Sequence, residues 1–289
     1  MFNRKQLFRR VAIVGTGFMG ASLGLAMKKK ELAKEIIGIG RHETSLREAT
    51  DIGAIDESTI DLKKGLIGAD LIILAAPVNG ILDVIDTLGQ DHKRSCIVTD
   101  LGSTKVEIVE RAEKLLHHSV LFVGSHPLVG SEKKGPTYAN AQLYEGATCI
   151  MTPTDKTNRL AKEKMKHFWS QLGCNVKMMT PVEHDQALAY TSHLPHLAAF
   201  ALMKSIPDAY LEHAGQGLKD TTRVSASDPE MWRDIAISNN KQILKALDEN
   251  VKILAALRKA IVTKDRETLM DIFKQAKTKR ESFDKNHAS

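Results

Sequence analysis

The segment from Val11 to Gly20 constrains the fold of this 289-residue chain more than any other. It reads Val-Ala-Ile-Val-Gly-Thr-Gly-Phe-Met-Gly, an apolar strand that runs into a G-x-G-x-x-G turn and then into a helix over residues 21–29. Gly15 permits the tight turn, Gly17 lets the backbone approach a pyrophosphate, and Gly20 lets helix and strand pack closely. Free N–H groups at the helix start attract phosphate charge. We therefore expect a dinucleotide site formed by Gly15, Gly17, Phe18, Met19 and Gly20.

Short apolar runs alternate with amphipathic segments from residue 10 to about residue 152. The runs cover residues 11–14, 36–39, 71–75, 96–99, 121–123 and 148–151. Continuous runs of this length, separated by helical periods, indicate buried parallel strands joined by crossover helices. The sequence predicts an α/β fold in which a Rossmann-type, doubly wound parallel sheet comes first.

Helical periodicity dominates after Thr152 and Pro153, interrupted by residues 175–179, which could form one edge strand. A long apolar helix is expected over residues 183–203, although Pro195 inside it should kink it or free a carbonyl. We expect three regions: a dinucleotide-binding domain over 1–152, a connecting helix and edge strand over 153–180, and an all-α substrate and dimerisation domain over 181–289.

The last two predicted helices, over 239–262 and 265–284, form a hairpin. Leu247, Leu254 and Ile261 recur every seven residues there, beside Leu244 and Val251. Such a stripe can pack against another helix. Periodicity alone does not distinguish an intramolecular core from the interface of a homodimer.

Composition excludes several classes of protein. Apolar residues make up 43% and charged residues 26%, as in globular proteins. The net charge of +6 is spread through helices and does not form a basic, aromatic-rich nucleic-acid surface, so an anionic small molecule suits it better. No run approaches the ~18 apolar residues of a membrane span. The three cysteines lack disulfide or zinc spacing, and we expect no metal and a reducing cytoplasm.

The residues after the second predicted strand bear on the choice of cofactor. Gly40 and Arg41 stand where an acidic residue usually binds the ribose 2′-hydroxyl. Arg41 can pair with a 2′-phosphate, so the sequence favours NADP over NAD. Arg41 could equally be a solvated loop cation, with Glu43 close enough to take the acidic role. Ala76 and Pro77, which follow the next strand, are expected to line the cofactor crevice or simply to end the strand.

Three segments carry candidate chemistry. The first, residues 99–105, runs from a strand end into a helix, with Ser103 at or near the N-cap. The second, residues 124–132, contains His126 just beyond another strand. Because parallel strands end at one sheet edge, this hydroxyl and this imidazole could meet near a nicotinamide. The third is Ser192-His193-Leu194-Pro195-His196 on the long helix, followed by residues 219–223 and 228–232.

Taken together, these segments resemble the prephenate and arogenate dehydrogenase family. The patterns D-x-G-S-x-K, H-P-x-x-G-S-E, S-H-L-P-H and K-D-x-T-R occur in that order between Asp100 and Arg223. The resemblance implies oxidative decarboxylation of prephenate to 4-hydroxyphenylpyruvate, or of arogenate to tyrosine. It also implies a Rossmann domain, a helical dimerisation domain and an active site between them.

The resemblance assigns roles that the residue chemistry supports. His126 accepts the proton of the ring hydroxyl as hydride leaves, a role that suits histidine near neutral pH. Ser103 contacts both this hydroxyl and the nicotinamide side. Arg223 offers a bidentate fork to a substrate carboxylate. Ser192, His193 and His196 are candidate substrate contacts, although His193 points in a different direction from His196 on a helix.

Structural alternatives accompany these roles. Arg223 could form only an ion pair with Asp220, and Trp232 is expected to pack and not to react. Glu132 is a candidate for reading the ammonium group of arogenate. Two rival functions are a β-hydroxyacid dehydrogenase, which would need a catalytic lysine on the long helix, and a non-catalytic dinucleotide sensor, which would not need Ser103, His126 and Arg223 together.

Overall fold

The structure is a computed structural model that describes residues 6–92, 94–130 and 133–287. The chain divides into two compact units, residues 1–240 and 241–289. Across the described ranges, no helix combines the length and the apolar character that crossing a membrane requires.

Six parallel strands form the main sheet of the first unit, in the order β3-β2-β1-β4-β5-β6. They are β1 (Phe8–Val14), β2 (Ala33–Ile39), β3 (Glu57–Thr59), β4 (Leu71–Leu74), β5 (Cys96–Asp100) and β6 (Val120–Val123). The order reverses between β1 and β4, which places a ligand crevice outside the carboxyl ends of these two strands. The predicted Rossmann-type sheet is confirmed.

One strand predicted for this sheet lies in a different sheet, and one strand of this sheet was not predicted. Residues 148–151 do form a strand, β8 (Thr148–Met151), but β8 pairs antiparallel with β7 (Ser125–Pro127) and parallel with β9 (Asn175–Met178) in a separate three-stranded sheet. The sixth parallel strand is instead β3, a short polar edge strand without the apolar run that would predict it. The edge strand expected over 175–179 is present as β9.

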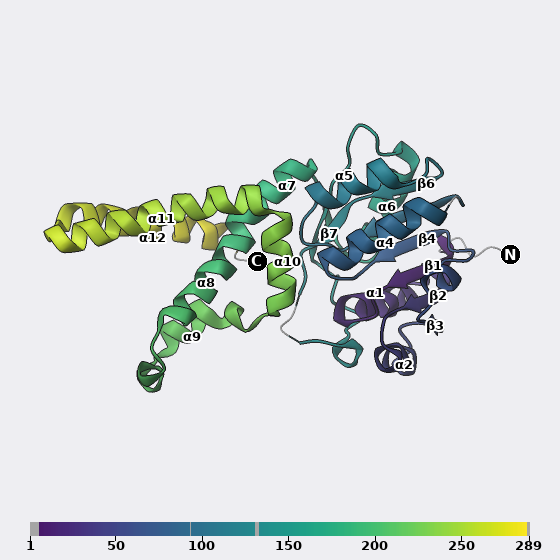
Figure 1. The fold of residues 1–289 in the computed structure, drawn as a ribbon, viewed down its shortest axis with the longest axis horizontal. Coiled ribbons are helices and arrows are strands. Elements are labelled where there is room, and N and C mark those ends of the chain that lie inside the picture. Colours follow the sequence, from purple (N-terminus) through teal and green to yellow (C-terminus); the bar gives the residue numbers. More distant parts are fainter. Residues whose placement is uncertain (1–5, 93, 131–132, 288–289) are drawn as a thin grey trace. The chain divides into compact units, whose positions relative to one another are not determined.

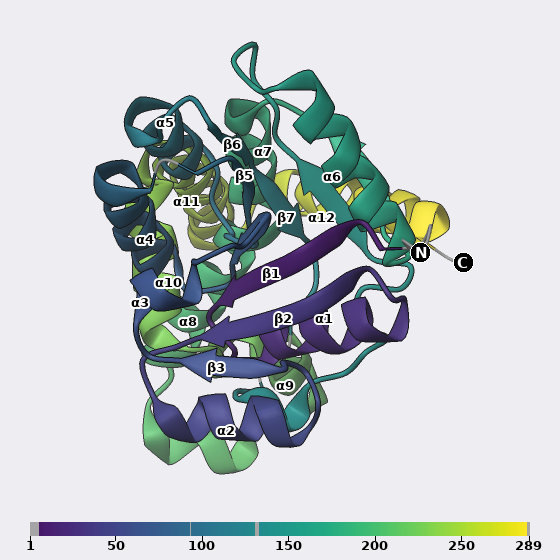
Figure 2. The ribbon, with the colours of Figure 1, turned by 90° about the vertical axis from the view of Figure 1, so that its right-hand side faces the viewer.

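Helices cover both faces of the main sheet (Figure 2). The crossover helices are α1 (Phe18–Lys29), α2 (Glu43–Asp51), α3 (Leu62–Gly65), α4 (Val78–Asp91) and α5 (Val106–Leu115). Figure 2 shows α4 and α5 together on one face, with α1 and α6 (Arg159–Gln171) on the other. The chain reverses its winding direction at the switch point, so the two sets of helices lie on opposite faces.

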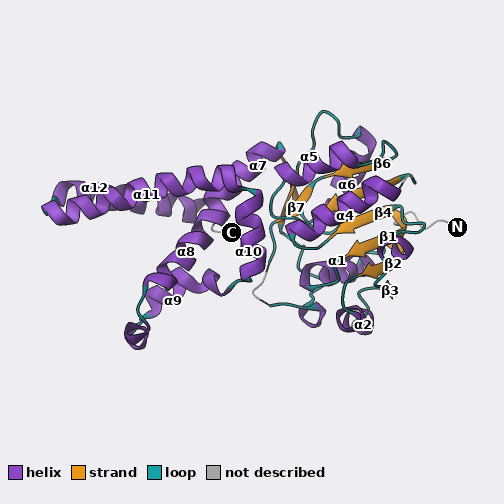
Figure 3. Cartoon of the chain, viewed as in Figure 1, coloured by secondary structure: helices purple, strands orange, loops and turns teal. Residues whose placement is uncertain are grey.

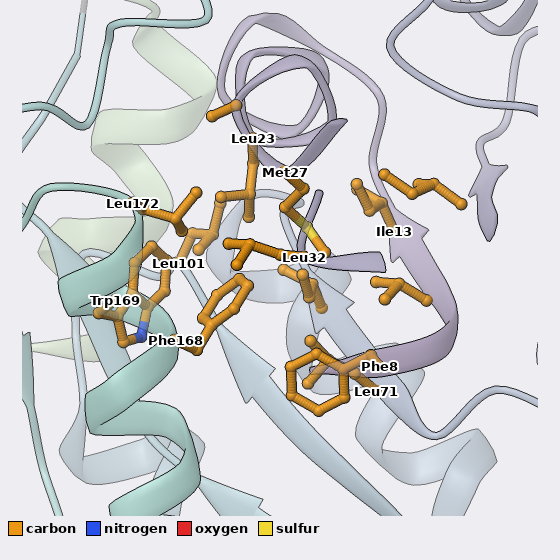
Figure 4. Packing of buried hydrophobic residues seen from close by; sticks show 14 of the residues in the cluster. Phe8, Ile13, Leu23, Met27, Leu32, Leu71, Leu101, Phe168, Trp169 and Leu172 are labelled. Atoms are coloured by element: carbon orange, nitrogen blue, oxygen red, sulfur yellow. The ribbon is translucent and has the colours of Figure 1, made fainter. Parts of the chain in front are cut away.

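The core between α1, α6 and the sheet is aromatic and close-packed (Figure 4). Phe8 and Phe168 meet edge to face with ring centroids 5.8 Å apart, and Phe168 meets Trp169 in the same way at 5.2 Å. Leu23 and Met27 of α1 are fully buried in the same cluster. Burying these side chains stabilises the fold by roughly 1.5–3 kcal/mol each, which holds the glycine loop at the start of α1 in place.

The last part of the first unit, residues 181–240, is helical, as Figure 3 shows. Its helices are α7 (Pro181–Leu188), a π-helical turn (Ala189–His193), α8 (Leu194–Ser205), α9 (Gln216–Thr222) and α10 (Pro229–Ser238), with short 3-10 helices over Asp208–His213 and Arg223–Ala226. Thr180 and Glu183 form a reciprocal capping box at the start of α7. The long helix expected over 183–203 is therefore present with an interruption. Its π turn ends one residue before Leu194 and Pro195, which begin α8; Pro195 lacks the N–H group that a continuous α-helix would need there.

The second unit contains almost all of α11 (Asn240–Thr263) and α12 (Arg266–His287), the predicted helical hairpin (Figure 1). Four residues of the predicted apolar stripe are more than half exposed: Leu244, Val251, Leu254 and Ile261. On α12, Met270, Phe273 and Phe283 are exposed as well. An apolar surface of this kind marks an interaction site.

Candidate active site

The glycine loop has the geometry that a pyrophosphate requires. Gly15 has φ +99°, and a Cβ there would lie 2.5 Å from the carbonyl oxygen of Ala75. A Cβ on Gly20 would collide with the carbonyl oxygen of Gly15. By contrast, a Cβ on Gly17 would meet no atom within 4 Å, and Gly17 caps α1 without any side-chain hydrogen bond. The loop therefore leaves open space in front of the first N–H groups of α1, at Phe18 and Met19, which fits a dinucleotide phosphate.

The flanking strand ends complete this crevice. Ala75 donates a backbone hydrogen bond to Val14 at 2.7 Å, which places the segment after β4 beside the glycine loop. Ala76 follows, and Pro77 is the N-cap residue of α4. Arg41 follows β2 and is exposed. Among the described residues it forms no ion pair, so its guanidinium is available to a ligand.

The loop after β5 is held by a buried ion pair. Asp100 and Lys105 are both fully buried and pair with each other. The Asp100 carboxylate also accepts hydrogen bonds from the backbone N–H groups of Gly102 and Ser125, at 2.9 and 3.1 Å. Lys105 Nζ donates to the Ser125 carbonyl at 3.1 Å. The pair thus ties the loop that carries Ser103 to the strand that carries His126.

Ser103 itself is not the cap of α5. The N-cap residue is Lys105, so Ser103 lies two residues before it, partly exposed in the loop. The N–H groups of Lys105 and Val106 donate instead to the Asp185 carboxylate of α7, at 2.7 and 2.9 Å. Ser103 thus lies near the N-cap and not at it, and a carboxylate from another element caps the helix. The Ser103 hydroxyl therefore has no capping role to fill.

His126 lies in β7 and is 8% exposed. Its Nδ1 lies 2.8 Å from Nε2 of His184, and Nδ1 of His184 lies 2.8 Å from Oδ1 of Asp185. His184 and Asp185 are themselves buried. Three side chains from β7 and α7 thus form a continuous hydrogen-bonded array.

Burial governs the protonation of His126. It lowers the pKa of His126 well below its ordinary value near 6.5, and the neighbouring charges of His184, Lys105 and His193 lower this pKa further. Burial also lowers the pKa of His184, although the hydrogen bond to Asp185 opposes the shift. Both imidazoles are therefore neutral near neutral pH, and a neutral imidazole can accept a proton.

The π turn and α8 bring further predicted residues to the same region. Nδ1 of His193, fully buried, lies 3.2 Å from Nδ2 of Asn239, which also donates to the Asp185 carbonyl at 2.8 Å. His196 is half-buried, with its Nδ1 2.8 Å from the Ser192 carbonyl. Ser192 is partly exposed in the π turn. His193 thus belongs to the buried network, whereas His196 is nearer the surface.

Arg223 lies near His196 and is exposed. Burial lowers the pKa of His196, and the positive charge of Arg223 lowers it further, whereas the hydrogen bond with the Ser192 carbonyl opposes the shift. The carboxylate of Asp220 accepts from Gln216 Nε2 at 2.7 Å, and within the described ranges no ion pair joins Asp220 to Arg223. The alternative in which Arg223 serves only that ion pair is therefore wrong, and its guanidinium is left for an anion. Glu132 lies outside the described residues.

The structure adds functional candidates that the sequence did not single out. They are His184, Asp185 and Asn239, all buried polar residues near His126. Lys105 is the lysine of the D-x-G-S-x-K pattern, which by itself assigned this lysine no role of its own. The only signal in the sequence was polarity inside segments that are otherwise apolar or helical. Each of the three also has a distant partner. Asp185 accepts from the backbone of Lys105, 80 residues away. His184 contacts His126, 58 residues away, and Asn239 donates to Asp185, 54 residues away. No local pattern reports such contacts.

The sheet, the open glycine loop and the buried imidazole beyond the strand ends define a dinucleotide-dependent dehydrogenase. The family models agree: prephenate dehydrogenase, nucleotide-binding domain, matches residues 23–178, and prephenate dehydrogenase, dimerization domain, matches residues 180–275. The chain belongs to the prephenate dehydrogenase family, as the sequence resemblance predicted.

Individual relatives cover nearly the whole chain. Prephenate dehydrogenase of Bacillus subtilis (strain 168) is 33% identical over 287 residues, 96% of this chain and 77% of that protein. A crystal structure of prephenate dehydrogenase from A. aeolicus in complex with hydroxyphenyl propionate and NAD+ is 36% identical, with a TM-score of 0.88 over 96% of this chain and 98% of the other. Arogenate dehydrogenase of Synechocystis is 29% identical, with a TM-score of 0.79 over 95% and 99%.

Proposed function

We propose that this protein catalyses the oxidative decarboxylation of prephenate to 4-hydroxyphenylpyruvate, with transfer of a hydride to a nicotinamide dinucleotide, as a step of tyrosine biosynthesis. The observation that carries the proposal is the buried, neutral His126 beyond the carboxyl ends of the strands, linked to His184 and Asp185. The relatives in B. subtilis and A. aeolicus, both named prephenate dehydrogenases, support it.

In this proposal the glycine loop and the N-terminus of α1 hold the dinucleotide, with Ala76 and Pro77 along the crevice. The bound nicotinamide ring supplies the hydride acceptor. His126 accepts the proton of the ring hydroxyl, which makes departure of the hydride from the same carbon less costly. Ser103, in the loop fixed by Asp100 and Lys105, orients this hydroxyl.

The remaining residues bind the dianionic substrate. Arg223 provides a fixed cation for a carboxylate, and a guanidinium can bind it through two parallel hydrogen bonds. His196, with Ser192 one turn earlier and His193 behind them, orients the substrate beside Arg223. Loss of carbon dioxide makes the ring aromatic, so the protein needs chiefly to position the substrate and to stabilise charge.

Arogenate is the alternative substrate, since the structural relative from Synechocystis is an arogenate dehydrogenase. The two substrates differ only at the side chain, a ketone against an ammonium. Glu132 is a candidate for this discrimination, because a carboxylate there would favour the ammonium group.

For the cofactor we propose that NADP is accepted through Arg41, which is exposed and follows Gly40. An acidic residue usually stands at this place in the fold, and it would repel a 2′-phosphate. The A. aeolicus relative was crystallised with NAD+, so a comparison of both dinucleotides is needed. We expect Arg41→Gln to lower kcat/KM for NADP by about 10-fold or more, the scale of one lost charge-assisted contact of about 1.5–3 kcal/mol, and to leave NAD unchanged.

We further propose a homodimer formed through α11 and α12. The exposed stripe of Leu244, Val251, Leu254 and Ile261 supports it, as does the match of residues 180–275 to a dimerization-domain model. Replacing Leu254 and Ile261 by lysine should yield monomers in analytical ultracentrifugation, whereas a dimer unchanged by both substitutions would contradict this interface.

The test of the proposed function is an assay of the purified protein with prephenate or arogenate and NAD or NADP, in all four combinations. Turnover with prephenate supports the proposal, and the preferred dinucleotide decides the role of Arg41. Turnover with arogenate alone would establish the alternative. A protein that binds the dinucleotide and reduces it with neither substrate would be a sensor and not this enzyme.

A further inference from the structure

We propose that His184 and Asp185 are positioning residues that hold His126 in one tautomer and take up its charge during the reaction. The inference deepens the proposed function and rests on it for the role of His126. It starts from three buried side chains in line, with His126 Nδ1 2.8 Å from His184 Nε2 and His184 Nδ1 2.8 Å from Asp185 Oδ1.

The carboxylate end of the array fixes every proton in it. Both oxygens of Asp185 accept backbone N–H groups, from Lys105 at 2.7 Å and from Val106 at 2.9 Å. These two groups stand at the start of the ten-residue helix α5, whose dipole favours a negative charge there. Asp185 therefore acts as an acceptor only, and the hydrogen on the His184 side belongs to Nδ1 of His184.

The tautomer of His126 follows from that of His184. A neutral imidazole carries one hydrogen, so His184 with Nδ1 protonated presents a lone pair at Nε2. His126 Nδ1 faces this lone pair and must donate to it. Nε2 of His126 is then left without a hydrogen, and it is the atom that can accept a proton from a substrate hydroxyl. In the opposite tautomer Nε2 would donate, and the base would be lost.

The same array can hold the charge that the reaction creates. When Nε2 of His126 takes the hydroxyl proton, the Nδ1 proton of His126 can pass to Nε2 of His184. The positive charge then lies on His184, where the hydrogen bond and the charge of Asp185 oppose the effect of burial. His126 is also buried, and among the described residues it has no carboxylate partner of its own. The hydride goes to the dinucleotide, and the pair of electrons released with carbon dioxide enters the ring.

Burial of the array matches the proton balance of this chemistry. Loss of hydride and carbon dioxide from the deprotonated substrate leaves a phenolate oxygen, and the product is a phenol, so the proton taken up must be returned. His184 is fully buried and Asp185 is 1% exposed, which limits exchange of this proton with bulk water. The array therefore stores the proton and delivers it back through His126 Nε2 to the phenolate, ready for the next cycle.

Two variants of His184 separate the two roles. His184→Gln keeps an amide oxygen that can accept from His126 Nδ1, but an amide cannot take up a proton. His184→Leu can do neither. We expect His184→Leu to lose about 10²-fold or more in kcat, the scale of general-base catalysis, with KM for prephenate and the Kd for NAD little changed, and we expect His184→Gln to lose less.

A spectroscopic test does not depend on turnover. In protein labelled with ¹⁵N-histidine, and with His126 assigned by comparison with His126→Asn, the ring nitrogens report directly which one carries hydrogen. We expect Nδ1 of His126 protonated and Nε2 bare near neutral pH, and a mixture of tautomers in His184→Leu. A wild-type His126 protonated at Nε2, or a folded His184→Leu with wild-type kcat, would overturn the inference. Should His184→Leu not fold, the wild-type spectrum still decides. A protein that fails to turn over prephenate but shows this tautomer would refute the proposed function alone.

Discussion

The imidazole of His196 lies flat against the indole of Trp232, with ring centroids 3.9 Å apart and an interplanar angle of 24°. His193 meets the same indole edge-on, with centroids 6.0 Å apart. Trp232 is 7% exposed on α10, so one buried aromatic side chain supports both histidines of the third motif. The sequence assigned Trp232 to packing, and the structure agrees, but the groups it packs against are proposed substrate contacts.

Replacing this indole should therefore affect substrate binding. A stacked aromatic pair is worth about 0.5–1.5 kcal/mol beyond its buried area, so Trp232→Ala should raise KM for prephenate by roughly 2- to 12-fold. Trp232→Phe, which retains a ring against His196, should raise it less. Steady-state kinetics of the two variants, with circular dichroism as a control for folding, checks this. Equal KM values in Trp232→Phe and Trp232→Ala would exclude the stacking role.

Alanine substitutions at two glycines of the same loop should affect two different properties, dinucleotide binding at Gly17 and stability at Gly20. A Cβ on Gly17 has open space around it, whereas a Cβ on Gly20 would collide with the Gly15 carbonyl. Gly17→Ala should cost about 1 kcal/mol or less in stability, because alanine is a poorer N-cap than glycine, yet it should weaken dinucleotide binding by obstructing the pyrophosphate. Gly20→Ala should lower the melting temperature clearly. Calorimetry and titration with NAD measure both effects, and unweakened binding in Gly17→Ala would contradict the assigned loop.

The buried pair of Asp100 and Lys105 should be costly to break from one side only. Lys105→Met leaves a buried carboxylate without its cation and should destabilise the fold by about 3–5 kcal/mol. Adding Asp100→Asn removes that charge and should recover part of the loss. Urea unfolding gives both free energies. Arg280→Met, which breaks the exposed pair with Asp284, is the matched control and should cost at most about 0.5 kcal/mol. Additive effects of the Asp100 and Lys105 substitutions would show that the pair is not coupled.

Buried neutral histidine should make the fold sensitive to acid. Burial lowers the pKa of His193 to about 4, with His184 and His196 adding to the shift, and Asp185 and the Ser103 backbone opposing it. Its ordinary value is near 6.5, so the unfolded chain binds this proton first as the pH falls. The stability present above about pH 6.5 should be lost progressively down to about pH 4, by about 3 kcal/mol from this group.

The measurement is urea unfolding between about pH 7 and about pH 4.5. His193→Gln should show a shallower decline than the wild type over this range, whatever its stability at neutral pH. His42 is exposed and follows β2, so His42→Gln serves as the control with an unchanged slope. A slope in His193→Gln as steep as in the wild type would mean that His193 does not titrate as its burial requires.

Sequence periodicity was sufficient for the parts of the fold that rest on local chemistry. The glycine loop, five of the six parallel strands and the helical hairpin follow from apolar runs and turn residues, which act over a few positions. β3 was missed because Glu57, Ser58 and Thr59 pair at an edge and carry no apolar signal. β8 was assigned to the wrong sheet because an apolar run shows that a strand is buried and not which strand it pairs with.

The residues of the site likewise fall into those that a local motif predicts and those whose role depends on a tertiary contact. His126 and Ser103 could be found because each follows a strand end within a recognisable motif. The cap of α5 could not, since Asp185 comes from a helix 80 residues further along the chain. A serine near a helix start is a sound local prediction, but tertiary contact supplied a carboxylate instead. His184 was overlooked for a related reason: its role exists only through contact with His126, 58 residues earlier.

The central claim is that His126 is the base of an oxidative decarboxylation, and one measurement tests it most directly: reduced dinucleotide and carbon dioxide are quantified together, with prephenate as substrate, for the wild type and for His126→Asn. The wild type should form the two products in equal amounts. His126→Asn should lose about 10²- to 10⁴-fold in kcat while it binds the dinucleotide as the wild type does. A His126→Asn variant with wild-type turnover, or a wild type that reduces the dinucleotide without releasing carbon dioxide, would contradict the account.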